Sequence, residues 1–445
     1  MVKVSMVSLG CPKNQVDAEQ MLYTLKENGF KITPNESDAD AIIVNTCGFI
    51  EEAKTEAIEN ILEAAKYKKE GNCRALIVTG CLAERYRDDV TNEIPEVDAC
   101  VGIGSNGRIA EIVKSVLKGI KANYYGDKTD LNLNTQRILG GPNFSAYLKI
   151  ADGCDNCCTY CAIPKIRGHL RSRRVEDVVA EAKRLAKSGV KELIVVAQDT
   201  TAYGVDIYKE SKLCELLREL VKIDGIHWIR TLYTYPERID DELLCLLRDE
   251  KKLVKYLDIP IQHCNNDILK RMNRKSDKEG LVSLIKHIRK TVPGITLRTT
   301  LIVGFPGEGE QEFEELHRFV KDMRFDRLGC FAYSPEEGTV AAGFEQTVDQ
   351  QKKQDRLELI MQSQNDIAQE KNSEKIGTVQ EVLIEGYDDY IKCYFGRSTA
   401  DAPDIDGKVF FLIPRPLKIG DFVNVKINDI LEYDLLGELS DEFTE

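Results

Sequence analysis

Apolar and polar positions alternate in blocks over residues 2–120 of the chain. Short apolar runs at 4–9, 41–45 and 75–79 predict buried strands. Between them, residues 15–28 and 51–69 place apolar side chains at helical spacing, and a further helix is predicted after Leu82. Strands that alternate with helices are typical of α/β proteins, so residues 1–120 are predicted to form a domain with a doubly wound parallel sheet.

A second series of strands and helices begins at residue 144. Six apolar segments, at 146–152, 192–199, 227–236, 256–263, 295–307 and 327–335, are separated by helical patterns. Six units fall short of the eight of a closed barrel, which predicts an open, partial (β/α)6 barrel over residues 144–372, with a connecting helix at 349–371. Residues 121–143 show no clear period and end in Gly-Gly-Pro-Asn, so they are predicted to be a linker.

The last segment, residues 373–440, changes to a period of two. Stretches such as TVQEVLIEGYDDYIKCYF and DFVNVKIND predict a small all-β barrel. The segment contains 13 acidic and 7 basic residues, and Asp388, Asp389, Asp404 and Asp406 are candidates for an acidic docking surface. A barrel that grips an RNA backbone is normally basic, so this charge favours a basic protein partner over tRNA. A surface that is acidic only for solubility would give the same count.

Composition indicates the cellular compartment and limits the possible roles of the cysteines. The 445 residues are 42% hydrophobic and 30% charged, with a net charge of −13, as in an ordinary globular protein. No apolar run approaches the roughly 20 residues that cross a bilayer, and the N-terminus lacks the pattern of a signal peptide. We therefore expect a cytoplasmic protein without a membrane partner. In that reducing compartment the 14 cysteines cannot be a disulfide framework, which leaves metal ligands, reactive thiols and core residues.

The densest group of cysteines, GCDNCCTYC, follows the first strand of the predicted barrel. Cys154, Cys158 and Cys161 have Cx3Cx2C spacing, which lets one loop bind three irons of a 4Fe–4S cluster and leaves the fourth iron open. We expect the amino and carboxylate groups of S-adenosylmethionine (SAM) at that iron. A zinc knuckle, or three unrelated thiols, would also explain the bare spacing. Cys157 permits a mirrored set with Cys154 and Cys161, and we interpret it as a bystander.

Three strands of the N-terminal domain also run into a cysteine each, at Cys11, Cys47 and Cys81. The carboxyl ends of parallel strands lie on one edge of the sheet, where doubly wound folds bind ligands. Three thiolates that converge there could hold a second cluster. Each of these cysteines alone would more simply be a buried core residue, and the repeated placement is what favours a site.

These motifs resemble those of the methylthiotransferase family of radical SAM enzymes, and the resemblance extends over nearly the whole chain. LGCPKNQVDAE, AIPKIRG, QDTTAYG, YLDIPIQH and AYSPEEGT are similar to the RimO branch, which modifies an aspartate of small-subunit ribosomal protein S-twelve. The tRNA-modifying MiaB branch has other motifs, such as GCQMN in place of the GCPKN found here. Cys157 is the one departure, because the family motif does not require it.

The resemblance implies an N-terminal cluster domain, a radical SAM barrel and a C-terminal TRAM barrel, which is a small OB-like β-barrel. It assigns a SAM-cleaving 4Fe–4S cluster to Cys154, Cys158 and Cys161, and an auxiliary 4Fe–4S cluster to the other three cysteines. It implies transfer of a methylthio group to the β-carbon of the aspartate, with a sulfur donor and an electron donor as partners and the substrate free or within the ribosome. A tRNA adenosine methylthiotransferase and a non-enzymatic iron–sulfur carrier are the alternatives.

Polar and aromatic residues in or near the barrel strands are candidates for binding SAM. Tyr160 lies between two of the cysteines and could pack on adenine. A surface aromatic without a ligand is an equally good interpretation. Gln198, Gln262 and Arg298 are candidates for polar contacts, and for each of them alone a structural role is as good an explanation.

Overall fold

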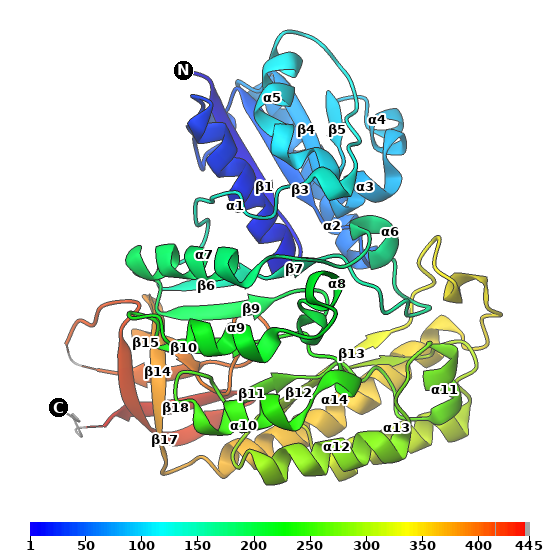
Figure 1. Cartoon of the computed structure of the whole chain (residues 1–445), viewed down its shortest axis with the longest axis vertical. Coiled ribbons are helices and arrows are strands. Elements are labelled where there is room, and N and C mark those ends of the chain that lie inside the picture. The colour runs from blue at the N-terminus through cyan, green and yellow to red at the C-terminus, as the bar shows by residue number, and fades with distance from the viewer. Residues whose placement is uncertain (414, 441–445) are drawn as a thin grey trace.

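The computed structural model describes residues 1–413 and 415–440. Its N-terminal part is a parallel sheet with the strand order β2-β1-β3-β4-β5 (Figure 1). The strands are β1 (Lys3–Ser8), β2 (Lys31–Ile32), β3 (Ala41–Thr46), β4 (Ala75–Gly80) and β5 (Ala99–Val101). Helices α1 (Pro12–Glu27) and α5 (Ile109–Leu117) pack on one face; α2 (Glu51–Glu70), α3 (Cys81–Tyr86) and α4 (Asp88–Glu93) pack on the other. Because helices cover both faces, β3 and β4 are wholly buried, and the predicted doubly wound sheet is confirmed.

The central part contains the six predicted strands in two parallel halves, ordered β10-β9-β6 and β11-β12-β13. Their bounds are β6 (Ser145–Lys149), β9 (Glu192–Val196), β10 (Trp228–Thr231), β11 (Tyr256–Asp258), β12 (Thr296–Val303) and β13 (Arg327–Ala332). The halves meet where the Thr234 N–H donates to the Asp258 carbonyl at 2.9 Å. Within the described residues β6 and β13 do not pair with each other, so the barrel is open, as expected.

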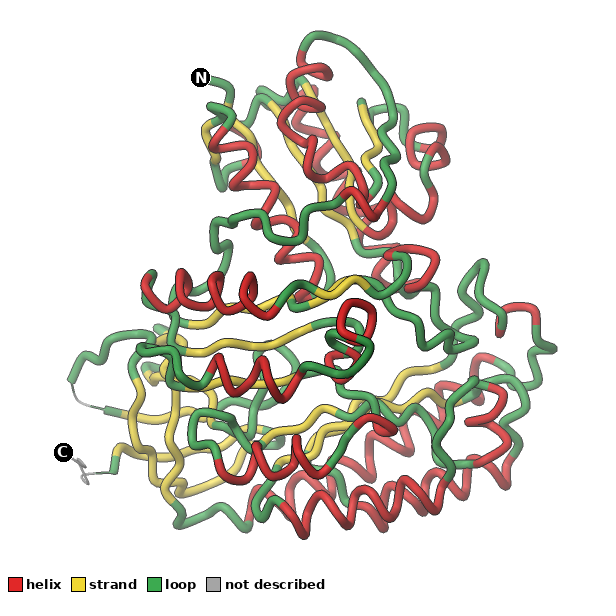
Figure 2. Tube along the Cα trace, viewed as in Figure 1, coloured by secondary structure: helices red, strands yellow, loops and turns green. Residues whose placement is uncertain are grey.

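Helices cover the outside of this partial barrel, as Figure 2 shows. They are α7 (Val175–Lys187), α9 (Leu213–Leu220), α10 (Asp241–Asp249), α12 (Lys278–Thr291), α13 (Glu310–Met323) and the long α14 (Gln350–Ser373). Shorter elements are α6 (Ile163–Arg167), α8 (Val205–Tyr208), α11 (Asn266–Arg271) and the antiparallel pair β7 (Ala151–Asp152) and β8 (Arg171–Ser172). No helix in the described part of the chain is long and apolar enough to cross a membrane.

The C-terminal part is a closed barrel with the strand order β14-β15-β16-β18-β17. The strands are β14 (Val379–Asp388), β15 (Cys393–Ser398), β16 (Val409–Leu412), β17 (Phe422–Leu431) and β18 (Asp434–Leu439). It packs against the partial barrel through an apolar cluster that joins Leu383 to Ile194 and Tyr256. Within this contact Glu192 of β9 pairs with Arg397 at 2.5 Å and with Arg230 at 3.2 Å.

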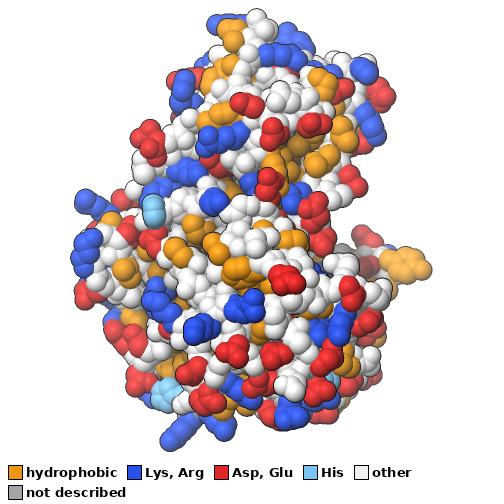
Figure 3. Space-filling model, turned by 90° about the vertical axis from the view of Figure 1, so that its right-hand side faces the viewer, with side chains coloured by type: hydrophobic (Ala, Val, Ile, Leu, Met, Phe, Trp, Pro, Cys, Tyr) orange, Lys and Arg blue, Asp and Glu red, His pale blue; other side chains and the backbone are white. Residues whose placement is uncertain are grey.

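This docking corrects part of the reasoning about an acidic surface. The Asp406 side chain is only 1% exposed, and its Oδ2 accepts a hydrogen bond from the Tyr256 hydroxyl at 2.6 Å. Asp406 therefore belongs to the contact with the partial barrel, whereas Asp389 and Asp404 are exposed. Figure 3 shows the side of the molecule toward which the carboxyl ends of the partial-barrel strands point, and acidic and basic side chains are interspersed over it.

The segment 121–143 between the first two parts is held against both of them. Arg137 pairs with Glu19 of α1 at 2.5 Å and with Glu181 of α7 at 2.7 Å. The Gln20 side-chain amide donates to the Leu133 carbonyl at 3.1 Å. The connection therefore fixes the N-terminal sheet on the partial barrel.

Candidate functional site

Cys11, Cys47 and Cys81, here called the N-terminal triad, follow β1, β3 and β4. In the order β2-β1-β3-β4-β5 the topology switches between β1 and β3, which is where doubly wound sheets bind ligands. The side chain of Asn14 joins two of the three turns, because its Nδ2 donates to the carbonyls of Leu9 at 2.7 Å and Thr46 at 3.2 Å. Residues far apart in sequence are thus held at one edge of the sheet.

Glycines allow these turns to approach closely. Gly10 has φ +87°, and a Cβ placed on it would lie 2.6 Å from the Cys47 Cβ. A Cβ on Gly48 would lie 2.6 Å from the Leu82 Cα, next to Cys81. Both distances are shorter than real Cβ contacts, so any larger residue would force the turns apart. The N-terminal triad therefore sits in a tight cradle.

Two cations act on the thiols of the N-terminal triad. Burial raises the pKa of the Cys81 thiol to about 12, with Arg167 acting in the opposite direction. Burial acts on Cys11 too, but the positive charges of Lys13 and Arg167 outweigh it and lower the pKa of that thiol below its ordinary value. Iron binds thiolates, so these cations favour the form of cysteine that holds a cluster.

Cys154, Cys158 and Cys161, here called the barrel triad, lie in the loop after β7. The loop begins at Gly153, whose φ is +78° and whose Cβ would fall 2.0 Å from the His169 carbonyl oxygen. The Cys158 Sγ lies 3.9 Å from the Tyr235 hydroxyl and 4.0 Å from Arg274 Nη1. Such donors would stabilise a ligating thiolate.

Cys157 differs from the barrel triad in exposure. Its side chain is exposed, while those of the three triad cysteines are half-buried. Its backbone has φ +53°, and its carbonyl accepts a hydrogen bond from the Asn273 Nδ2 at 2.9 Å. This placement favours the Cx3Cx2C register over the mirrored one.

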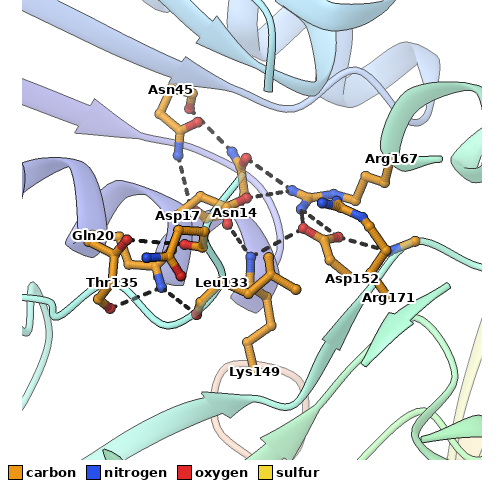
Figure 4. A network of polar contacts seen from close by, with 12 residues as sticks. Asn14, Asp17, Gln20, Asn45, Leu133, Thr135, Lys149, Asp152, Arg167 and Arg171 are labelled. Carbon is orange, nitrogen blue, oxygen red and sulfur yellow. Dashed lines mark hydrogen bonds and ion pairs between the residues drawn. The ribbon is translucent and has the colours of Figure 1, made fainter. Parts of the chain in front are cut away.

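A buried charge network joins the turns of the two triads (Figure 4). Arg167 of α6 places Nη2 3.7 Å from the Cys81 Sγ and 2.9 Å from Asp17 of α1, and Nη1 3.0 Å from Asp152. Lys149 pairs with both carboxylates. Because Asp152 directly precedes Gly153 and Cys154, these four charges, with Arg171 also acting on Asp152, position the barrel triad relative to the N-terminal triad.

The four residues expected to contact SAM occupy different positions. Gln198 donates to Asp152 at 3.1 Å, and Tyr160 packs beside Met272 and Phe305 near the barrel triad. Gln262 has φ +70°, a strained backbone of the kind that clusters at functional sites. Arg298 is the third residue of β12 and is paired with Asp258 at 3.2 Å and Asp406 at 3.6 Å, so its guanidinium already has carboxylate partners.

The sequence reasoning did not single out Lys13, Asp152, Arg167 or Arg274. A hydropathy pattern predicts that a charged residue lies on the surface. Only the fold shows that these four residues are buried. The available signal was their place in or beside the motifs: Lys13 lies in LGCPKNQVDAE and Arg167 in AIPKIRG.

In the described residues no group of three or more His, Cys, Asp or Glu side chains is close enough to hold a single metal ion. A cluster makes a different demand, because each cysteine binds a separate iron and the thiols lie farther apart. The donor chemistry of each triad, three cysteine thiols, fits an iron–sulfur cluster.

Known proteins match this chain along its whole length. Residues 3–102 match "Uncharacterized protein family UPF0004", residues 148–320 match the "Radical SAM superfamily" and residues 376–439 match "TRAM domain". "Ribosomal protein uS12 methylthiotransferase RimO" of Acetivibrio thermocellus is 50% identical over 456 aligned residues, which cover 99% of this chain and 99% of that protein. The chain belongs to the RimO family.

Further comparisons agree with this family. The RimO protein of Caldicellulosiruptor saccharolyticus is 50% identical over 442 residues, covering 99% of this chain and 100% of its own. Among solved structures, the radical S-adenosylmethionine methyltransferase TsrM from Kitasatospora setae has a TM-score of 0.57 at 13% identity and covers 75% of each chain. At that identity the likeness shows the fold alone.

Proposed function

We propose that this chain is a radical SAM methylthiotransferase that attaches a methylthio group to the β-carbon of an aspartate in ribosomal protein uS12. The names of the full-length relatives support the reaction and the substrate. The observation that carries the proposal is the pair of cysteine triads, which lie at strand ends of two different sheets and are joined through Arg167. In the proposed reaction one triad would serve to form a radical and the other to supply sulfur.

The barrel triad would hold the SAM-cleaving 4Fe–4S cluster and the N-terminal triad an auxiliary 4Fe–4S cluster. When bound, these clusters and SAM supply the radical and sulfur chemistry, which an unactivated C–H bond requires because acids and bases cannot break it at neutral pH. The chain itself positions the parts: Gly153 turns the barrel loop, and Arg167 and Arg274 place positive charge beside thiolates. Tyr160, Gln198, Gln262 and Arg298 are proposed to bind SAM.

The partners follow from this reaction. Action on a ribosomal protein supports a cytoplasmic location, and the reaction would need a sulfur donor and an electron donor as partners. Action on tRNA is the alternative within the same chemistry. The interspersed charges in Figure 3 form no basic stripe on that face, and the C-terminal barrel has a net acidic composition, so electrostatics favours the protein substrate.

An anaerobic reaction tests the proposal. The reconstituted protein is incubated with SAM, sulfide and a reductant, and is offered uS12 and bulk tRNA in separate reactions. Mass spectrometry should find a methylthio group on one aspartate of uS12 and none on tRNA. Modification of tRNA alone would favour the tRNA methylthiotransferase instead. Absence of 5′-deoxyadenosine from every reaction would show that the protein is not a radical SAM enzyme.

A further inference from the structure

In the described part of the chain, Lys13 is a buried cation with no carboxylate paired to it. It is the second residue of α1, its side chain is 7% exposed, and its Nζ lies 3.4 Å from the centroid of the Tyr233 ring. In residues 1–413 and 415–440 the other buried lysines meet oxygen: Lys149 pairs with two carboxylates, and Lys353 donates to a carbonyl at 3.0 Å. A contact with an aromatic face recovers only part of the cost of burying an ammonium.

The position of Lys13 is between the two triads. It follows Cys11 by two residues, whereas Tyr233 belongs to the end of β10 and precedes Tyr235, whose hydroxyl lies 3.9 Å from the Cys158 Sγ. The ammonium thus reaches from the N-terminal sheet to the mouth of the partial barrel. In the proposed reaction one substrate side chain must approach both triads, which lie on the two sides of this contact.

The backbone of Tyr233 is held in place by hydrogen bonds. Tyr233 has φ +61°, which is uncommon for a residue other than glycine. Its N–H donates to Asp258 Oδ2 at 3.0 Å, and its carbonyl accepts from the Thr200 hydroxyl at 3.1 Å. These bonds maintain a strained backbone at the residue whose ring the Lys13 ammonium contacts.

We propose that Lys13 binds the side-chain carboxylate of the substrate aspartate and so determines which side chain is held between the two triads. This inference rests on the proposed function. An ammonium is a compact charge with three donors, and a carboxylate can accept a charge-assisted hydrogen bond from it in a desolvated site. The β-carbon of aspartate is bonded directly to that carboxylate carbon, so holding the carboxylate also holds the atom to be modified.

A competing explanation is that Lys13 serves only the thiolate of Cys11. Lys13→Met removes the charge at similar length, Lys13→Arg keeps it, and Lys26→Met changes an exposed lysine at the other end of the same helix. Iron content and SAM cleavage without substrate are measured first on the full-length reconstituted proteins. We expect all three variants to reach the iron content and the SAM cleavage of the wild type, because Arg167 still lowers the pKa of the Cys11 thiol when the Lys13 charge is removed, and the barrel triad is untouched. Loss of iron from Lys13→Met with retention in Lys13→Arg would assign the charge to the cluster and overturn the proposal.

Binding then tests the contact itself. Affinity is measured for uS12 and for uS12 with its modified aspartate replaced by asparagine. Lys13→Met should weaken binding of uS12 roughly 30-fold or more, and should change binding of the asparagine form by less than about threefold. Lys13→Arg should retain most of the affinity, and Lys26→Met should bind as the wild type does. Equal weakening for both forms of uS12 would overturn the inference alone. A wild type that leaves uS12 unmodified in the mass-spectrometric reaction would overturn the proposed function, and this inference with it.

Discussion

The buried network around Arg167 allows a quantitative test of how the two triads are held together. Asp17, Lys149, Asp152 and Arg167 have side-chain exposures of 0 to 2% and balance to zero charge. Arg167→Met leaves Asp17 and Asp152 to share Lys149, so one buried negative charge is uncompensated, which costs about 3–5 kcal/mol. Asp152→Asn leaves an excess of positive charge and should also destabilise. The double variant is neutral again, so we expect it to be more stable than the sum of the two effects by about 2 kcal/mol.

The assay is urea unfolding of the cluster-free proteins. Trp228, the single tryptophan of the chain, is buried in β10, so its fluorescence reports the partial barrel directly. Arg248→Met is the control, because Arg248 is 43% exposed and pairs with an exposed aspartate; we expect a change within about 0.5 kcal/mol. If the effects of Arg167→Met and Asp152→Asn add within about 0.5 kcal/mol, the two charges are not coupled and the reasoning is refuted.

Three further expectations concern the clusters, pH and salt. Replacing the N-terminal triad with alanines should preserve reductive SAM cleavage, because the barrel triad is intact, and should abolish methylthio transfer. Mass spectrometry of 5′-deoxyadenosine and of uS12 measures the two reactions separately. Burial opposes ionisation of Glu192, but Arg397 and Arg230 lower its pKa from 4.5 to about 2. Its stabilising contribution is thus complete above about pH 4.5 and is lost as the pH falls toward 2. Glu192→Gln should therefore flatten the fall of Tm in that range. The same fall of Tm in the variant and the wild type would contradict the assignment. Replacing the exposed Asp389 and Asp404 with lysine should weaken uS12 binding and flatten the salt dependence of its affinity. Binding titrations at several salt concentrations measure both effects. If neither changes, the acidic barrel has no role in docking.

Hydropathy periodicity predicted the positions of the strands that carry the cysteines. The expected strands at 41–45 and 75–79 correspond to Ala41–Thr46 and Ala75–Gly80. The barrel strands were predicted too long: the segment 227–236 contains only Trp228–Thr231 as strand. The apolar pattern continues past the strand into loops that turn toward the site, and periodicity alone cannot mark where ladder hydrogen bonds end.

Buried charges were the part that the sequence did not reveal. Asp17 and Lys149 are 132 positions apart and meet only because the N-terminal sheet docks on the partial barrel. Asp406 was read as a surface charge and is a docking residue. Whether a charged side chain is solvated or paired depends on contacts between separate domains, which local patterns do not contain.

The iron content of cysteine variants tests the central claim most directly. Reconstituted without oxygen, the wild type should bind about eight irons per chain, and alanine substitution of either triad should leave about four. Cys157→Ala, and Cys214→Ala on α9 as a matched half-buried control, should keep about eight. Chemical iron and sulfide determination, with Mössbauer spectra to identify 4Fe–4S clusters, gives the count. About eight irons in either triple variant, or a fall to about four in Cys157→Ala, would contradict the assignment of two clusters to these six cysteines.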